Sequence, residues 1–196
     1  AMKYYMNNTV NTTHLVKCAS IYGVKKFILS STAATYGEPT FQGNKQNITE
    51  EFDTKPINTY GKSKLMSEQV IKDEEKANKY FKYCIFRYFN VAGADIHYER
   101  EELLPRVGEA HDPETHLIPL VVKTALCKRD YISIFGEDYD TPDGTCIRDY
   151  IHVDDLADAH IKAINYLDEN ESDIFNCGYG YGYSVKEIID SVKNTM

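Results

Sequence analysis

The chain has 196 residues, of which 42% are hydrophobic and 27% are charged, and its formal net charge is −8. This balance is that of an ordinary globular protein, and the length suits one large domain, or one domain with part of another. A net negative charge repels phosphate backbones and acidic lipids, which argues against a general nucleic-acid or membrane-surface binder.

Three further classes are disfavoured because their sequence patterns are missing. No apolar run is long enough to span a bilayer, and the N-terminus has no signal-peptide pattern, so we expect a cytoplasmic protein. The cysteines are odd in number, scattered and never in C-x-x-C spacing; they are Cys18, Cys84, Cys127, Cys146 and Cys177. Their distribution predicts neither a disulfide framework nor a zinc site, and no metal is expected.

The first half of the chain alternates helical and strand patterns. Spaced apolar residues predict a helix over about 5–22, and a short apolar run at 26–31 predicts a buried strand. Glycines and prolines over 37–58 are typical of a surface loop. A second helix is predicted over about 60–79 and a second buried strand over 83–89.

The second half is more polar. Residues 93–115 are predicted to be irregular, and we interpret their acidic side chains as a solvated loop rather than a metal site; these are Glu99, Glu101, Glu102, Glu109, Asp112 and Glu114. The elements expected after them are a helix over 117–128, a strand over 132–135, a turn at Asp143–Gly144, a helix over 154–167, a strand over 174–177 and a final helix capped by Ser184 and Glu187.

This alternation of helix and strand predicts an α/β fold with a parallel sheet. Both strong strands end in polar residues, Ser30–Ser31 in the first and Asn90 after the second. Ligands bind at the carboxyl edge of open α/β sheets, so a crevice is expected there. A compact doubly wound domain would have more strands before residue 1 and further structure after Met196.

The pair Tyr60 and Lys64 is the sharpest chemical signal. The two residues are four apart and share one face of the second predicted helix. A tyrosine hydroxyl is a poor base at neutral pH, and a nearby ammonium favours its phenolate form, so the pair suits a general acid/base. On spacing alone a packed tyrosine beside a solvated lysine is the commoner explanation.

An ordered series of motifs changes that balance. From about Tyr5 to Ser184 the chain reads S-S-T-A-A-T-Y-G, Y-G-K-S-K-L, R-Y-F-N-V-A-G-A, H-L-I-P, I-F-G-E-D-Y and D-G-T-C-I-R-D-Y-I-H-V-D-D-L-A. Each motif is modest by itself. Together they resemble the extended short-chain dehydrogenase/reductase family, and within it the UDP-glucose 4-epimerases.

The resemblance implies an incomplete Rossmann-like, doubly wound parallel sheet with part of a small C-terminal substrate-binding region. Residues 1–92 would be the C-terminal part of an NAD-binding domain. Residues 93–196 would be mostly a UDP-sugar-binding region, with segments that return to the sheet. The family's G-x-x-G-x-x-G phosphate loop is not found in these 196 residues, and its last UDP contacts would lie beyond them.

The resemblance also assigns roles to single residues. Tyr60 would be the catalytic acid/base, Lys64 would bind the nicotinamide ribose, and Thr32 would hydrogen-bond the reacting sugar hydroxyl. The other NAD contacts would come from Asn7 and Phe89. The UDP-sugar contacts would come from Asn90, His116, Leu117, Ser133, Phe135, Arg148 and Tyr150.

The implied activity is epimerisation of UDP-glucose and UDP-galactose at C4, as in galactose metabolism. Related dehydratases need a carboxylate pair just after the hydroxyl residue, and Ala33 and Ala34 stand there. Two alternatives stay open: a catalytically inactive truncated fragment, and another UDP-sugar-modifying member of the family. Self-association is expected, since the family dimerises through a helix pair that includes the catalytic helix.

Overall fold

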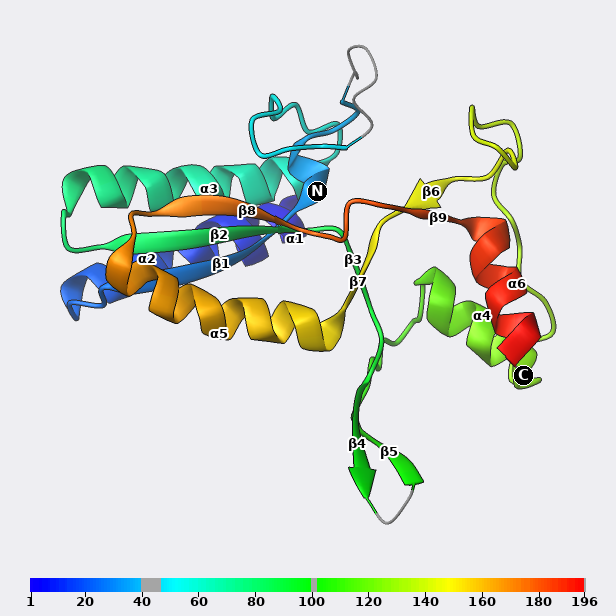
Figure 1. Ribbon diagram of the computed structural model, residues 1–196. Helices are drawn as coiled ribbons and strands as arrows, with labels where there is room; N and C mark the ends of the chain where they lie inside the picture. Colours follow the sequence, from blue (N-terminus) through cyan, green and yellow to red (C-terminus); the bar gives the residue numbers. More distant parts are fainter. Residues whose placement is uncertain (40–46, 100–101, 196) are drawn as a thin grey trace. The chain divides into compact units, whose positions relative to one another are not determined.

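The computed structural model describes residues 1–39, 47–99 and 102–195 (Figure 1). These residues form two compact units, one made of Ala1–Phe89 and Ala157–Cys177, the other of Asn90–Leu156 and Gly178–Met196. The centre of the expected 37–58 loop, at 40–46, lies outside the described residues, as does Glu101. No helix in the described ranges is long and apolar enough to cross a membrane.

The first unit is built on a parallel sheet of three strands. Its order is β1 (Lys26–Thr32), β2 (Lys82–Tyr88) and β8 (Asp173–Cys177). Thr32 pairs with Tyr88, and Tyr88 pairs with Cys177, so the strands end together at their carboxyl edge. The predicted parallel α/β sheet is confirmed.

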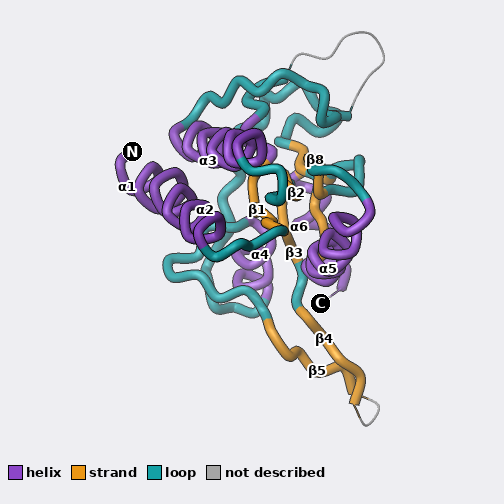
Figure 2. Tube along the Cα trace, turned by 90° about the vertical axis from the view of Figure 1, so that its left-hand side faces the viewer, coloured by secondary structure: helices purple, strands orange, loops and turns teal. Residues whose placement is uncertain are grey.

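Helices cover both faces of this sheet. Figure 2 shows α2 (Asn11–Ile21) and α3 (Thr59–Ala77) on one side and α5 (Val153–Glu169) on the other. The predicted first helix is confirmed as a continuous helical stretch of α1 (Met2–Tyr4), η1 (Tyr5–Val10) and α2, although η1 is wound as a π-helix, which its sequence did not predict.

Side-chain alternation along the strands separates two apolar layers. On the α2 and α3 side the core is formed by Val16, Ala19, Leu29, Ile71, Phe81, Tyr83 and Ile85. On the α5 side, Phe86 packs on the His160 ring at 5.0 Å, and Phe175 packs on Tyr166 at 5.2 Å. Successive β2 residues therefore serve opposite faces, as the two-residue period of a strand requires.

The second unit is made of short paired strands and two helices. Its elements are β3 (Asn90–Ala92), β4 (Asp95–Glu99), β5 (Glu102–Val107), α4 (Leu117–Ala125), β6 (Ile147–Arg148), β7 (Tyr150–His152), β9 (Tyr183–Ser184) and α6 (Val185–Thr195). β3 pairs with β7 in parallel, whereas β4 with β5 and β6 with β9 are antiparallel.

Two sequence expectations in this unit are wrong. The stretch 93–115 is not irregular throughout, because β4 and β5 form an antiparallel ribbon in it (Figure 1). Residues 132–135 are not a strand; Phe135 is 87% exposed, and an extended segment without a paired neighbour has no ladder to join. The expected capping box of α6 is confirmed, since Ser184 N donates to Glu187 Oε2 at 2.7 Å and Glu187 N to Ser184 Oγ at 3.1 Å.

Candidate functional site

Tyr60 lies in the first turn of α3. The helix begins at an N-cap, Asn58, whose Oδ1 accepts the N–H of Gly61 at 2.8 Å. The Tyr60 ring is 36% exposed and lies 5.8 Å from the ring of Tyr4, centroid to centroid. This partial exposure leaves the phenol accessible to a ligand.

Lys64 follows one helical turn later and reaches the sheet. Its Nζ donates to the backbone oxygen of Ser30 in β1 at 2.9 Å. Burial lowers the pKa of the Lys64 ammonium. Burial raises the pKa of Tyr88, whose hydroxyl donates to Ser30 Oγ at 2.7 Å, so Lys64 and Tyr88 both contact Ser30 near the end of β1.

Thr32 is the last residue of β1 and is 9% exposed. Its hydroxyl oxygen accepts the N–H of Ala34 at 3.2 Å and so caps the short 3-10 helix η2 (Ala33–Thr35). Thr35 Oγ1 donates to the backbone oxygen of Thr32 at 2.8 Å. These bonds fix the backbone around Thr32 at the same strand end that Lys64 reaches.

Gly61 is a site residue that sequence reasoning missed. A Cβ added there would lie 2.4 Å from the backbone oxygen of Ala34, which is closer than any real contact of this kind. Helix α3 can approach the residues after Thr32 this closely only with glycine at 61. The available signal was a glycine in the first turn of a helix, where most other residues are more favourable.

Replacing Gly61 with Ala is expected to lower the free energy of unfolding by about 1–3 kcal/mol, the usual cost of overpacking. Helix propensity alone would favour Ala by about 1 kcal/mol, so a net loss isolates the steric effect. The matched control is Gly108→Ala, whose added Cβ has its nearest atom, Ala94 Cβ, at 3.8 Å. Urea unfolding followed by circular dichroism measures both; equal stability of the two variants would contradict the close approach.

The two other predicted cofactor residues lie in the same unit. Asn7 is exposed on η1, and its neighbours bind α3: Asn8 Nδ2 donates to Ser63 Oγ, and Thr9 Oγ1 donates to Ser63 O, each at 2.9 Å. Phe89 follows β2, and its N–H donates to Cys177 O at 3.0 Å. The structure thus places η1 beside α3, and the contact is made by Ser63, which sequence reasoning did not single out.

All seven predicted substrate residues belong to the second unit. Asn90 pairs with Tyr150 across β3 and β7, so the structure brings these two together. Burial raises the pKa of Tyr150. Arg148 lies in β6, where its Nη1 donates to Ile147 O at 2.9 Å.

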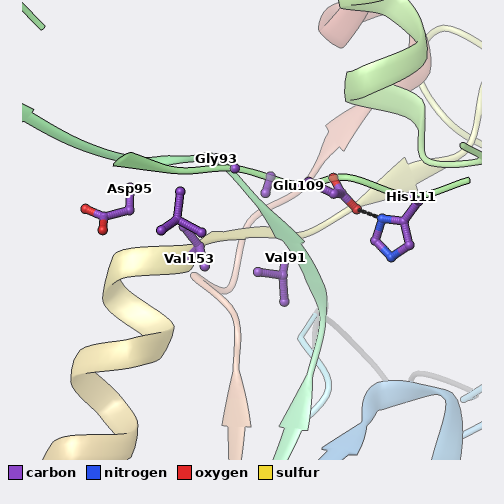
Figure 3. Close-up of a pocket in the computed structure, with 9 residues that line it drawn as sticks. Val91, Gly93, Asp95, Glu109, His111 and Val153 are labelled. Atoms are coloured by element: carbon purple, nitrogen blue, oxygen red, sulfur yellow. Dashed lines mark ion pairs between the residues drawn. The ribbon is translucent and has the colours of Figure 1, made fainter. Parts of the chain in front are cut away.

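The remaining four lie at the start of α4 or in the stretch that follows it. His116 is the residue before this helix and Leu117 is its first residue, whereas Ser133 and Phe135 lie in a stretch without helix or strand. Strand pairing groups only Asn90 with Tyr150, and a common site for all seven stays a prediction. The unit also contains a largely apolar hollow of about 300 Å³, lined by Val91, Ala92, Gly93, Asp95, Val107, Gly108, Glu109, His111 and Val153 (Figure 3).

The residues around Tyr60 fit one end of NAD. Lys64 brings an ammonium to the strand edge and Thr32 brings a hydroxyl, the donors that a nicotinamide ribose and a sugar hydroxyl require. The G-x-x-G-x-x-G spacing that would cradle the cofactor pyrophosphate does not occur in the 196 residues. The chain therefore fits the reactive end of NAD and does not itself supply the pyrophosphate loop.

Comparison with known proteins identifies the family of the chain. A family model described as "NAD dependent epimerase/dehydratase family" matches residues 1–178. The chain is 46% identical to a UDP-glucose 4-epimerase of Rhizobium meliloti (strain 1021) over 191 residues. The match covers 97% of this chain and 55% of that protein. The chain spans about half the length of the curated relatives it matches.

Two solved structures are also similar. The UDP-Glc/GlcNAc 4-epimerase from Campylobacter jejuni is 54% identical with a TM-score of 0.77, over 98% of this chain and 55% of that one. The UDP-glucose 4-epimerase from Bifidobacterium longum, solved in complex with NAD+ and UDP, is 39% identical with a TM-score of 0.82, over 97% of this chain and 54% of that one. These likenesses confirm the predicted fold class.

Proposed function

The chain belongs to the NAD dependent epimerase/dehydratase family, and we propose that it carries the catalytic residues of a UDP-glucose 4-epimerase, which interconverts UDP-glucose and UDP-galactose at C4. The observation that carries the proposal is the bond from Lys64 Nζ to Ser30 O, which fastens the Tyr60–Lys64 turn to the strand that ends in Thr32. The names of the relatives support the choice of substrate.

Under this proposal, the two units would have different binding functions. The first unit, with β1, β2, β8, α3 and most of α5, would be the C-terminal part of an NAD-binding domain. The second unit would bind the UDP-sugar. The division at Phe89–Asn90 and the return of 157–177 to the sheet are what a Rossmann-like domain with an inserted substrate region would produce.

Proton transfer at the sugar 4-hydroxyl would be the task of Tyr60. NAD, when bound, supplies the hydride acceptor for C4. The Lys64 ammonium stabilises the Tyr60 phenolate, which takes the hydroxyl proton and, as the neutral phenol, later returns it, while Thr32 hydrogen-bonds the same hydroxyl. Asn7 and Phe89 would contact the cofactor beside them.

Substrate binding would fall to the second unit. Arg148 suits the diphosphate because a guanidinium makes charge-assisted, bidentate bonds to phosphate oxygens. Asn90 and Tyr150, which pair across β3 and β7, would hold the nucleotide with it. His116, Leu117, Ser133 and Phe135 would complete the UDP contacts.

Two alternatives follow from specific observations. The chain spans about half of its relatives and lacks the phosphate-loop spacing, which favours a catalytically inactive fragment. The same catalytic residues would also serve another UDP-sugar. Ala33 and Ala34, which form η2 directly after Thr32, offer no carboxylate for a dehydratase.

The deciding experiment combines cofactor binding with turnover. NADH fluorescence is titrated with the chain, and UDP-glucose is incubated with chain and NAD while UDP-galactose is followed by chromatography. Binding with interconversion supports the proposal. Binding without turnover of UDP-glucose, but with turnover of another UDP-sugar, points to a different member of the family. The absence of both binding and turnover supports the inactive fragment.

We also propose a cytoplasmic homodimer. Leu15 and Ile21 on α2 and Met66 on α3 are exposed apolar side chains, and a second copy would cover them. Sedimentation velocity is expected to show a dimer, and Leu15→Lys with Met66→Lys is expected to shift it to the monomer. A monodisperse monomer of the unmodified chain would contradict self-association.

A further inference from the structure

Four side chains converge in the second unit between β5 and α4. They are Glu109, His111, Glu114 and His116, and each offers one oxygen or Nδ1 atom. These four atoms all lie within 4.8 Å of one another. They have the spacing E-x-H-x-x-E-x-H and lie in the segment that leads to the N-terminus of α4.

The separations between these atoms are those of hydrogen bonds and ion pairs, somewhat shorter than the edges of a zinc coordination shell. His111 Nδ1 lies 2.9 Å from Glu109 Oε1, and His116 Nδ1 lies 3.0 Å from that same oxygen and 2.9 Å from Glu114 Oε1. Ligand atoms about 2.0–2.1 Å from a tetrahedral zinc ion lie about 3.3 Å apart. Figure 3 shows the Glu109 carboxylate directed at the Nδ1 atom of His111.

Hydrogen bonding alone satisfies this arrangement poorly. The Nδ1 of His116 faces two carboxylate oxygens, yet an imidazole nitrogen carries at most one hydrogen. The cluster contains two carboxylates and neither a lysine nor an arginine. A divalent ion placed between the four atoms would neutralise both charges.

Local bonds prepare Glu114 for this role. Its Oε1 accepts the N–H groups of His116 and Thr115, each at 2.8 Å. These two backbone bonds hold the carboxylate in place before any ion arrives.

We propose that Glu109, His111, Glu114 and His116 form a binding site for a divalent transition-metal ion, with Zn²⁺ as the best match; the site uses Nδ1 of His116 and leaves its Nε2 for the UDP contact proposed above. Two imidazoles exclude Mg²⁺ and Ca²⁺, which prefer shells made of oxygen alone, and suit Zn²⁺, Co²⁺ or Ni²⁺. The ion would tie the chain at 109–111 to the residue that starts α4. The sequence-based prediction that the chain has no metal site was made from the cysteines and the acidic residues. It overlooked the two histidines that alternate with Glu109 and Glu114.

The test is a metal titration, which does not depend on epimerase activity. Zn²⁺ is titrated calorimetrically into the metal-free chain, without a histidine tag and in a phosphine reductant. One ion per chain is expected, with a higher melting temperature. His111→Ala and Glu109→Gln are each expected to weaken binding by more than about 100-fold, because even outer-shell partners of metal ligands change affinity 10–100-fold.

Matched variants separate this site from others. His14→Ala and Glu51→Gln remove the same side chains at exposed positions of the first unit and are expected to leave Zn²⁺ affinity unchanged. Circular dichroism confirms that each variant is folded. Co²⁺ absorption reports the ligands, and no thiolate charge-transfer band is expected. The proposal is overturned by no Zn²⁺ binding, by unchanged binding in the Glu109 and His111 variants, or by a thiolate band.

Discussion

Replacing Glu68 with Gln is expected to lower the free energy of unfolding by about 3–5 kcal/mol, the usual cost of breaking a buried ion pair. The Glu68 side chain is fully buried in α3, and Arg87 of β2 is 3% exposed. Arg87 Nη2 donates to Glu68 Oε2 at 2.7 Å and Arg87 Nε to Oε1 at 3.1 Å. Glutamine would leave the guanidinium buried without its counter-charge.

Urea unfolding of the chain measures this effect, and two controls define it. The double variant Glu68→Leu with Arg87→Met removes both charges and is expected to recover most of the lost stability. Asp190→Asn breaks an exposed pair with Lys193 and is expected to cost at most about 1 kcal/mol. A Glu68→Gln variant as stable as Asp190→Asn would mean that the buried pair contributes no more than a surface pair.

The ion pair matters for chemistry because of its position. Ser31, which precedes Thr32, donates its hydroxyl to Glu68 Oε1 at 2.5 Å. Glu68 itself is four residues after Lys64, one turn along the same helix. A single carboxylate thus joins α3 to β1 and to β2, and it fixes the turn that carries Lys64 relative to the strand that carries Thr32.

Arg87 extends the network towards β8. Its guanidinium lies over the Tyr36 ring at 4.7 Å, and the Tyr36 hydroxyl donates to Asn176 Oδ1 at 2.7 Å. Asn176 Nδ2 in turn donates to Ile48 O at 2.9 Å. All three strand ends of the sheet are therefore connected by buried or partly buried polar contacts as well as by apolar packing.

The periodic parts of this fold were predictable, and the partners of its buried charges were not. Apolar runs at β1 and β2 and the Ser184–Glu187 capping box have local sequence signatures, and the structure confirms each of them. From the sequence alone, Glu68 is indistinguishable from the exposed charged residues of an amphipathic helix. Only the long-range pairing with Arg87, nineteen residues away, shows that it belongs to the interior.

The candidate site shows the same limit. Tyr60 and Lys64 were predicted because a helical repeat places them on one face and an ordered motif series surrounds them, and Thr32 because of the family resemblance of that series. Gly61 could not be identified in this way, since its role depends on the backbone of Ala34 across a tertiary contact. The β4–β5 ribbon was missed because its polar, acidic sequence carries no clear two-residue alternation, and cross-strand bonds hold it instead.

Replacing Tyr60 with Phe is expected to lower kcat for the interconversion of UDP-glucose and UDP-galactose by about 10²–10⁴-fold, the range that general acid–base groups contribute. The variant removes one hydroxyl and keeps the ring that contacts Tyr4. Stability is therefore expected to change by no more than about 0.5 kcal/mol, as for other partly exposed positions. KM is expected to change little, because the hydroxyl acts on the proton being transferred.

The matched control is Tyr22→Phe, which removes the same hydroxyl from a position that is 82% exposed and distant from α3 in sequence. Its kcat is expected to equal that of the unmodified chain. If Tyr60→Phe raised KM and left kcat unchanged, Tyr60 would be a binding residue and not the proton-transfer group. If both variants kept full activity, the Lys64 ammonium and the Thr32 hydroxyl would have to act on the substrate without it, and the proposed division of roles would be wrong.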